Sequence, residues 1–478
     1  MAWGPVLGIA GAISALLLLV APRYGWHRDE LYFLEAAEHL AWGYVDQPPF
    51  TPAVARLADV VAPGNLVVLR LLPALASAVT VTLGALIVRE LGGRRSAQIA
   101  GAAVVASGGF VLGVGHLLST AVFDLTAWLA LLYIAAGLMR RADPRWWLLF
   151  GGVAGLSMLN KNLLVLLGAA LLTGLVVERR WDLLLTPWLA AGVALALGLA
   201  APNLLWQADH GWPQADMARV LSERLAGENR ATLLPLQVLF VGPAYVLVLW
   251  RGARWFAADV TARSFRPLLW AWPAGLVAAF ATGGRPYYVL PLTTVVVLAG
   301  VVASDRSQLH GLRWLVVPNF VFSVLFALPI LPLSTTKVTA ELNEAVAETV
   351  GWPQLADQVA SVVDELPPRE RANLILLTGS YGEAGALDRF GPARGLPPAY
   401  SPHNGYADFR RPADDDATVV AVRFELPHLA RHFDRCEQVA TVDNGLDVDN
   451  EVQGTPILVC RGLVGTWPDV WEQLRFLS

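Results

Sequence analysis

Long apolar runs recur through the first two thirds of the 478-residue sequence and leave few folds open to it. In lipid the backbone needs hydrogen-bond partners within its own segment, so such runs favour transmembrane helices. The chain is 55% hydrophobic and only 15% charged, which is typical of a polytopic membrane protein. We expect about eleven spans, several of them shorter than ~20 residues, at residues 5–22, 66–88, 97–115, 118–139, 146–159, 163–177, 183–201, 232–250, 267–281, 287–303 and 313–332.

The placement of arginine predicts the orientation of these spans. The segment Val6–Ala21 lacks a basic start and a cleavage site, so we interpret it as a retained first helix. With the N-terminus inside, the basic loops all face the cytoplasm, as the positive-inside rule requires. These loops contain Arg94, Arg95, Arg140, Arg141, Arg145, Arg179, Arg180, Arg251, Arg254, Arg263, Arg266, Arg306 and Arg313. Arg23 and Arg28 depart from the pattern, beside two acids, and the later loops outweigh them.

This orientation predicts three polar parts outside the membrane: residues 23–65, residues 202–231 and the end of the chain. After Leu333 the composition changes to acids, prolines and glycines with short β-like runs at 374–378, 419–424 and 456–460. Helical patterns lie at 338–349 and 353–365. We therefore expect a transmembrane domain at 1–333, with a first outer loop at 23–65, and a soluble extracytoplasmic α/β domain at 334–478.

Two features of this last domain leave alternatives open. The stretch TGSYGEAGALDRF (378–390) combines a strand, a glycine turn and a helix, like a phosphate-binding turn, but lacks the G-x-G-x-x-G spacing. Tight packing of the glycines is the favoured interpretation. The only two cysteines, Cys436 and Cys460, can form a disulfide in an oxidising compartment or remain two free thiols.

The first outer loop holds the densest group of carboxylates beside a membrane span. A helix is predicted there, with Asp29 and Glu30 in its first turn, where acids favour the helix dipole. Gly43 should end it, and the prolines at 48, 49 and 52 should keep the next segment extended. One face is apolar, so the helix should lie in the membrane interface, where basic residues are the usual polar complement. Its acids instead indicate a site that handles protons or cations.

Further candidate residues lie at the same predicted level of the membrane. Asp46 precedes the paired prolines, and Asp124 interrupts an apolar span near its outer end, where an acid is costly unless it is paired or functional. Lys161, Arg285 with its neighbours Tyr287 and Tyr288, and His116 in a short outer turn complete the set. Each also has a structural interpretation: Asp29–Glu30 as a helix-start pair, Lys161 as a snorkelling cation, and Arg285 with its tyrosines as an interface anchor.

Carboxylates and cations on one face of a membrane suggest a particular chemistry. A carboxylate can remove a proton from a hydroxyl group. Arginine and lysine can hold a phosphate, arginine through its planar fork. A reaction of a lipid-linked phosphate that carries a polar group, at the outer leaflet, would need both a carboxylate base and a cation that holds the phosphate.

Several motifs resemble one known family. DELYF (29–33) followed by GYVDQPPFTP (43–52) is similar to the first outer loop of the C-type glycosyltransferases. The resemblance is to glycosyltransferase family 39 and its bacterial relatives, which include protein O-mannosyltransferases and the aminoarabinose transferases of lipid A. Five further motifs, spread over most of the chain, are similar to the bacterial subgroup. They are GLSMLNKN (155–162), PNLLWQADHGWP (202–213), GGRPYYVLPL (283–292), SYGEAGALDRFGP (380–392) and PILVCRG (456–462).

The resemblance implies a sugar donor on a polyprenyl phosphate and inversion at the anomeric carbon. It implies Asp29 as the general base and Glu30 as its partner, with Asp46 and Asp124 at family acids near the same cavity. Lys161 and Arg285 match basic positions near the lipid phosphate. The extra domains of the protein mannosyltransferases have no counterpart here, which favours a lipid or cell-envelope glycan as acceptor.

We therefore expect a multi-pass glycosyltransferase of the plasma (inner) membrane, acting at its outer face, with the bilayer and the lipid donor as partners. The net charge of −4 gives no indication of nucleic-acid binding. No defined metal site is visible in the sequence, and a divalent cation remains an alternative role for the acids. One competing hypothesis is a transporter or flippase, which would place paired ionisable residues near the bilayer midplane and repeat its two halves. Another is a non-catalytic envelope-assembly protein.

Overall fold

The computed structural model describes residues 1–335 and 343–478, which form two compact units. The membrane unit comprises Met1–Ala21, Gln47–Thr51 and Arg70–Leu328. The C-terminal unit comprises Pro22–Asp46, Pro52–Leu69 and Pro329–Ser478. Most of the first outer loop thus groups with the C-terminal residues, and the predicted boundary at 333/334 stays a prediction. Of the predicted helical pattern at 338–349, residues 338–342 fall outside the described residues, and the described part contains the short helix α19 (Glu344–Ala347).

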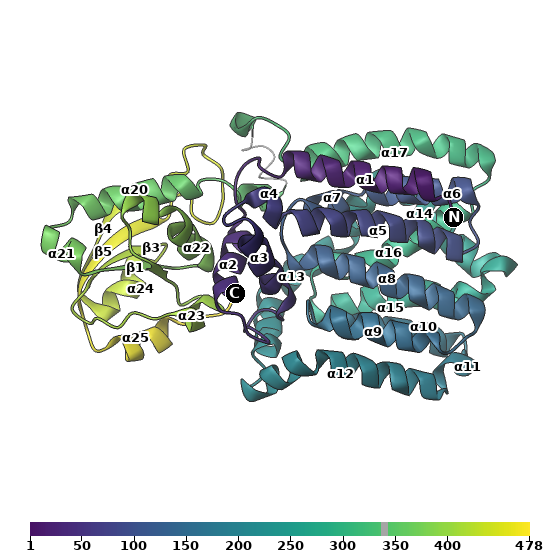
Figure 1. Cartoon of the computed structure of the whole chain (residues 1–478), viewed down its shortest axis with the longest axis horizontal. Helices are drawn as coiled ribbons and strands as arrows, with labels where there is room; N and C mark the ends of the chain where they lie inside the picture. The colour runs from purple at the N-terminus through teal and green to yellow at the C-terminus, as the bar shows by residue number, and fades with distance from the viewer. Residues whose placement is uncertain (336–342) are drawn as a thin grey trace. The chain divides into compact units, whose positions relative to one another are not determined.

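The membrane unit is built entirely from helices in the part of the chain that the structure describes (Figure 1). Its apolar runs satisfy their backbone groups internally, which is the requirement that lipid imposes. Its elements are α1 (Trp3–Val20), α5 (Leu71–Glu90), α6 (Arg95–Ala106), α7 (Gly109–Gly115), α8 (Thr120–Arg141), α9 (Trp146–Met158), α10 (Leu164–Val177), α11 (Trp181–Leu184), α12 (Pro187–Asp209), α13 (Pro213–Val241), η1 (Pro243–Tyr245), α14 (Val246–Ala258), η2 (Val260–Phe265), α15 (Arg266–Thr282), η3 (Pro286–Val289), α16 (Leu290–Val302) and α17 (Arg306–Ala327).

Each predicted apolar run coincides with a helix or a pair of helices. Among the described residues, five helices are long and apolar enough to cross a membrane, and two bent pairs raise that number to seven by length and composition. Shorter apolar helices at Trp146–Met158, Leu164–Val177 and Pro286–Val302 add to them. The predicted class, a polytopic helical membrane protein, is confirmed.

Two predicted spans are not straight helices. The run 97–115 divides into α6 and α7, which meet at 60°, and the run 232–250 divides between α13 and α14, which are bent by 89°. At the second break Gly242 has φ +131°, a backbone conformation that a side chain would oppose, and Pro243 follows it. The polar segment 202–231, predicted as an outer loop, is mostly the end of α12 and the start of α13. Its alanines, leucines, arginines and glutamates are good helix formers, which outweigh its polarity.

Small residues let helices of the membrane unit approach closely. Gly252 of α14 packs against the backbone of Val296 in α16, and Gly300 of α16 packs against the backbone of Val248 in α14. A methyl group at either glycine would collide with a carbonyl oxygen. This reciprocal contact is the small-residue packing that holds helices together in lipid, where hydrophobic burial gives little gain.

The C-terminal unit contains a five-stranded mixed sheet in the order β2-β1-β3-β5-β4. β1 (Leu374–Thr378) pairs parallel with both β2 (Ala399–Tyr400) and β3 (Thr418–Val422), while β5 (Pro456–Leu463) pairs antiparallel with β3 and with β4 (Phe433–Thr441). The predicted α/β domain is confirmed, and three of its strands match the predicted runs. The helices of this unit are α2 (Arg28–Glu38), most of α3 (Phe50–Val61), α4 (Leu66–Leu69), η4 (Leu333–Thr335), α19 (Glu344–Ala347), α20 (Trp352–Glu365), α21 (Pro368–Ala372), α22 (Tyr381–Phe390), η5 (Pro392–Arg394), α23 (Tyr406–Phe409), α24 (Leu426–Leu429), η6 (Ala430–His432) and α25 (Trp467–Leu474).

The glycine turn at 378–390 serves the crossover from β1 to β2. Strand β1 is followed by α22, whose N-cap Ser380 accepts a hydrogen bond from the backbone of Gly382. Gly385 packs against the backbone and Cβ of Leu31 in α2. These contacts agree with the preferred interpretation, in which the glycines allow tight packing.

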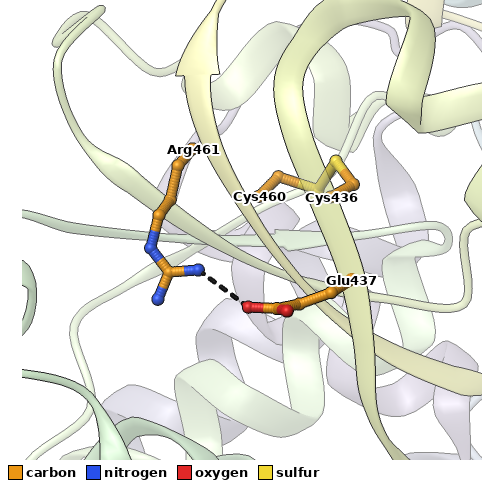
Figure 2. The surroundings of a disulfide bond; sticks show 4 residues. All are labelled: Cys436, Glu437, Cys460 and Arg461. Carbon is orange, nitrogen blue, oxygen red and sulfur yellow. Dashed lines mark hydrogen bonds and ion pairs between the residues drawn. A yellow bond between two sulfur atoms is a disulfide. The ribbon is translucent and has the colours of Figure 1, made fainter.

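The two cysteines form a disulfide between neighbouring strands (Figure 2). Cys436 of β4 and Cys460 of β5 are direct partners in the antiparallel register, and no described cysteine is free. Beside them Arg461 donates a hydrogen bond to Glu437 at 3.1 Å. Of the two alternatives that the sequence left open, the structure contains the bridge.

Candidate active site

Helix α2, which carries the first-loop acids, begins with a capping box. The imidazole Nδ1 of His27 accepts a hydrogen bond from the backbone of Asp29 at 3.1 Å, and Glu30 accepts one from the backbone of His27 at 2.9 Å. These reciprocal bonds satisfy donors that a helix start leaves open. Glu30 is fully buried, so its carboxylate acts in this cap. It remains a site candidate only as a neighbour of Asp29.

The end of α2 differs from the prediction. The helix stops at Glu38, before Gly43, and the hydroxyl of Tyr44 donates hydrogen bonds to the carbonyls of Ala36 and His39 at 3.1 Å. The side chain of Tyr44 thus takes up carbonyls that the helix end leaves open. The segment predicted to stay extended also becomes helical at Phe50, with Pro52 inside the first turn of α3, a position where proline needs no N–H partner.

Asp29 is held from two sides but remains partly exposed. The hydroxyl of Tyr381, the first residue of α22, donates a hydrogen bond to its Oδ1 at 2.9 Å. The Nε of Arg28 lies 3.6 Å from the same oxygen, and 34% of the Asp29 side chain is exposed. The nearby His27 Nδ1 already accepts the backbone N–H, so it is not a charged partner. The carboxylate is thereby oriented while one side stays accessible.

Asp46 is held in a similar way. Its Oδ1 accepts a hydrogen bond from the hydroxyl of Tyr32 at 2.9 Å, and the rings of Tyr32 and Tyr381 pack 4.8 Å apart. Burial raises the pKa of Asp46 to about 7, with a smaller contribution from the charge of Asp29 and against the effect of the Tyr32 hydrogen bond. Two carboxylates, each bound by a tyrosine of one packed pair, thus belong to a single site, which we call the tyrosine–carboxylate site.

An ion-pair network supports this site from behind. Arg28 pairs with Glu451, and Arg423 pairs with Glu451 at 2.7 Å and with Glu383 at 3.1 Å. Burial alone would raise the pKa of Glu451, but the guanidinium groups of Arg28 and Arg423 hold this pKa at about 2. Breaking a network of this kind is costly because it leaves a buried charge alone. The network fixes Arg28 and with it one neighbour of Asp29.

The membrane unit contains a second polar group, the lysine–tyrosine cluster of Lys161, Tyr287 and Tyr288. The ammonium of Lys161 donates a hydrogen bond to the Tyr287 hydroxyl at 3.0 Å and lies 5.0 and 4.9 Å from the ring centroids of Tyr287 and Tyr288. Asp124 lies within electrostatic reach of Lys161, and Arg285 within reach of Tyr288. The structure therefore brings together five residues that the sequence singled out separately.

Several buried polar atoms of the membrane unit lack partners among the described residues. Asp124 is 4% exposed and its Oδ1 makes no hydrogen bond. Both amide atoms of Gln47 are buried and unpartnered as well. The short segment that follows Gln47 is fixed, because Thr51 donates to Asn160 Oδ1 at 3.1 Å and Asn160 donates to the Thr120 carbonyl at 2.9 Å. Unpaired buried polar groups are expensive in a membrane protein, so they indicate a place for a polar ligand.

One further candidate residue is His116, and one further alternative role for the acids is metal binding. His116 is buried at the end of α7, where its Nδ1 lies 3.0 Å from the carbonyl of Gly113. Among the described residues, no group of three or more His, Cys, Asp or Glu side chains could hold a metal ion.

Sequence reasoning did not identify Tyr32, Tyr381, Arg28 or Arg423 as parts of a site. Tyr381 lies far from Asp29 in the sequence, and Arg28 stood out only as an exception to the topology rule. Tyr32 and Tyr381 did leave a signal, since they belong to DELYF and SYGEAGALDRFGP, two motifs that resembled the family. Arg28 was an exception to the positive-inside rule, and the structure gives a cause for this exception. The charge of Arg28 is compensated by an ion pair with Glu451.

The chain is similar to a known family over part of its length and to a solved structure over most of it. Residues 46–206 match the family "Dolichyl-phosphate-mannose-protein mannosyltransferase". The structure is similar to that of ArnT from Cupriavidus metallidurans bound to undecaprenyl phosphate, with a TM-score of 0.59 and 17% sequence identity over 95% of this chain and 97% of that one. The apo structure of the same ArnT has the same TM-score and coverage at 15% identity. No curated protein sequence matches the chain.

These findings confirm the predicted resemblance and the predicted membrane fold. The matched segment includes Asp46, Asp124 and Lys161, and the name of the matched family specifies a sugar donor linked to dolichyl phosphate. The predicted enzyme class, a membrane glycosyltransferase with such a donor, is confirmed as well. Residues 46–206 are thus similar to the dolichyl-phosphate-mannose-protein mannosyltransferase family, and the chain has the fold of ArnT.

Proposed function

We propose that the protein transfers a sugar from polyprenyl phosphate to a hydroxyl group of a lipid or cell-envelope glycan, with inversion at the anomeric carbon. The observation that carries this proposal is the lysine–tyrosine cluster, a largely enclosed cation in the membrane unit beside unpartnered polar atoms. A lipid phosphate supplies acceptor oxygens for the cation of this cluster, and the hydroxyl groups of its sugar supply donors for Asp124 Oδ1. The undecaprenyl phosphate bound by ArnT, which has the same fold, is a ligand of this chemistry.

Asp29 is the proposed general base. The acceptor oxygen forms a bond to the anomeric carbon while its proton passes to the Asp29 carboxylate, and the bond from that carbon to the phosphate oxygen breaks. Tyr381 and Arg28 orient the carboxylate without covering it. One base suffices because the leaving phosphate needs little protonation, so Asp46 is free to bind substrate hydroxyl groups.

Lys161, Arg285 and the Tyr287 hydroxyl are proposed to hold the departing phosphate. As the bond breaks, negative charge collects on the leaving oxygen, and fixed cations and donors stabilise it. Lys161 is already positioned by two aromatic rings, so little reorganisation is required. Asp124 then balances the charge of Lys161 before the donor arrives.

We propose that the C-terminal unit faces the outside of the plasma membrane. The arginine-rich loops favour a cytoplasmic N-terminus, and the Cys436–Cys460 disulfide is typical of an oxidising compartment. A reporter that is active only outside, fused after Ser478, should be active, and a cytoplasmic reporter at the same place should be silent. The opposite pattern would contradict this orientation.

Envelope glycolipids of a deletion strain test the reaction. Mass spectrometry should reveal one lipid or glycan species without its sugar, and plasmid-borne wild-type protein should restore it. The Asp29→Asn variant, expressed to the same level in the membrane, should not restore it. Restoration by that variant would contradict the assignment of the base, and an unchanged glycolipid profile would contradict the proposed acceptor class.

A further inference from the structure

A groove between α6 and α17 is not used by the proposed reaction. These two helices of the membrane unit contact each other, and a cavity of about 840 Å³ lies along them. That volume is in the range of small-molecule sites. Its walls are apolar, formed by Ile99, Ala100 and Ala103 of α6 and by Leu312, Val316 and Val317 of α17. Both helices are labelled in Figure 1.

One end of the groove is strongly basic. Arg94 and Arg95 lie at the start of α6, and Arg313 and His310 lie on α17. Arg95 donates to the carbonyl of Met1 at 3.4 Å, and Arg313 lies 5.1 Å from the ring of Trp314. Neither partner carries a formal charge, so two positive charges remain uncompensated by these contacts.

The surroundings of the groove are those of a membrane interface. Trp314, next to Arg313, is 70% exposed, and Val317 is 60% exposed on the same helix. An exposed tryptophan beside arginine is typical of the level of the lipid headgroups. Further along α17 the exposed side chains of Val321, Phe322 and Leu325 are apolar, as expected where acyl chains cover the helix.

From this arrangement we propose that the groove binds one anionic phospholipid. Its phosphate is held by Arg95 and Arg313, one from each wall, and one acyl chain lies between α6 and α17. Charge complementarity selects the anionic headgroup, because basic residues at a membrane surface attract anionic lipids by about 1 kcal/mol each. The apolar walls select a lipid over a soluble phosphate. This site is separate from the proposed donor site and does not depend on the proposed reaction.

Native mass spectrometry of the detergent-solubilised protein tests the proposal, with phosphatidylglycerol and phosphatidylcholine as probes. Wild type should retain one phosphatidylglycerol in preference to phosphatidylcholine. The double variant Arg95→Gln, Arg313→Gln should bind phosphatidylglycerol roughly 30-fold more weakly. The matched control is Arg254→Gln, Arg263→Gln, which removes two exposed arginines outside the groove and should bind like wild type.

A second variant separates the groove from the charges. Ala100→Phe narrows the groove and keeps every arginine, so it should also weaken phosphatidylglycerol binding. Equal binding of both lipids by wild type would mean a general lipid shell and would overturn the proposal. Equal loss in the groove variant and the control variant would do the same, because it would show a response to net charge alone.

Discussion

The tyrosine–carboxylate site of the C-terminal unit and the lysine–tyrosine cluster of the membrane unit are both built from charges and tyrosines, but they are completed differently. In the first, each proposed carboxylate already accepts a hydrogen bond from a tyrosine. In the second, Lys161 is positioned while Asp124 Oδ1 and the amide of Gln47 lack partners among the described residues. One site is complete without a ligand, and the other leaves polar atoms to be satisfied.

This difference fits the two roles that we propose. A general base works best when its orientation is fixed before the substrate arrives, since a fixed group needs no rearrangement during the reaction. A binding site gains affinity when the ligand satisfies polar atoms that were buried and unpaired. Variants in the first site should therefore affect turnover, and variants in the second should affect donor binding.

The largest effect is expected for Asp29→Asn. The amide keeps the shape and the acceptor for Tyr381 but cannot take a proton, so turnover should fall by about 10²–10⁴-fold, the usual contribution of a general base. Donor affinity should change little. The measurement is the rate of transfer in nanodiscs at saturating donor, with donor affinity determined separately.

The control for this variant is Glu38→Gln. Glu38 lies on the same helix, is 55% exposed and pairs with Arg56, so its loss should leave turnover unchanged. Glu35 would be unsuitable, since it bonds to Arg410 at 2.5 Å and is 14% exposed. Near wild-type turnover in Asp29→Asn would move the role of base to Asp46 or Asp124.

Lys161→Met should produce the second largest effect, and this effect should be on donor affinity rather than on turnover. The substitution keeps most of the side-chain volume and removes the charge. Donor affinity should fall by about 10–100-fold, the value of a hydrogen bond to a charged group. Arg219→Gln, an exposed arginine of α13, is the control. If Lys161→Met bound the donor normally and only turnover fell, the contrast between the two sites would fail.

Tyr381→Phe should have a smaller effect than Asp29→Asn. It retains the ring against Tyr32 and removes only the hydroxyl that orients Asp29, so turnover should fall by about 10-fold with unchanged donor affinity. Tyr400→Phe removes a hydroxyl from the same unit away from the site and should have no effect. A weaker donor affinity in Tyr381→Phe would contradict the division of roles.

Asp46→Asn should have the smallest effect on turnover, together with an effect on stability that depends on pH. Its pKa of about 7 lies above the ordinary value of 3.8, so the fold favours the neutral carboxyl. Wild type should therefore lose stability as the pH rises from about 4 to 7, relative to Asp46→Asn, with a constant difference above that. Thermal unfolding at pH 8 should show the variant higher by about 5 °C, and exposed Asp416→Asn should show no such trend. A variant that was less stable at pH 8 would refute this.

The sequence predicted the membrane part well because lipid imposes strong rules. The positions of the apolar runs, the start of α2 and the strands β1, β3 and β5 all follow from local patterns. The bends at Gly108 and Gly242 were missed because an apolar run has the same composition whether it is straight or broken. Strand β4 was missed because its exposed polar side chains hide the alternation.

Local composition also explains why only part of the site was predicted. Asp124, Lys161 and Arg285 stood out because charges are rare in apolar segments. Tyr381 and Arg423 did not, since they lie in a polar region where such residues are common. Their roles depend on contacts with the distant α2 and with the ion-pair network around Glu451, which no local pattern reveals.

Donor consumption by the purified wild-type protein tests the central claim most directly. The folded protein in nanodiscs would be given a mixture of sugars linked to polyprenyl phosphate, together with envelope glycolipids, and free polyprenyl phosphate would be measured by mass spectrometry. We predict that polyprenyl phosphate is released in proportion to the sugar gained by an acceptor, and that nucleotide-linked sugars are not consumed. Sugar transfer from a nucleotide donor without release of polyprenyl phosphate would contradict the proposed reaction.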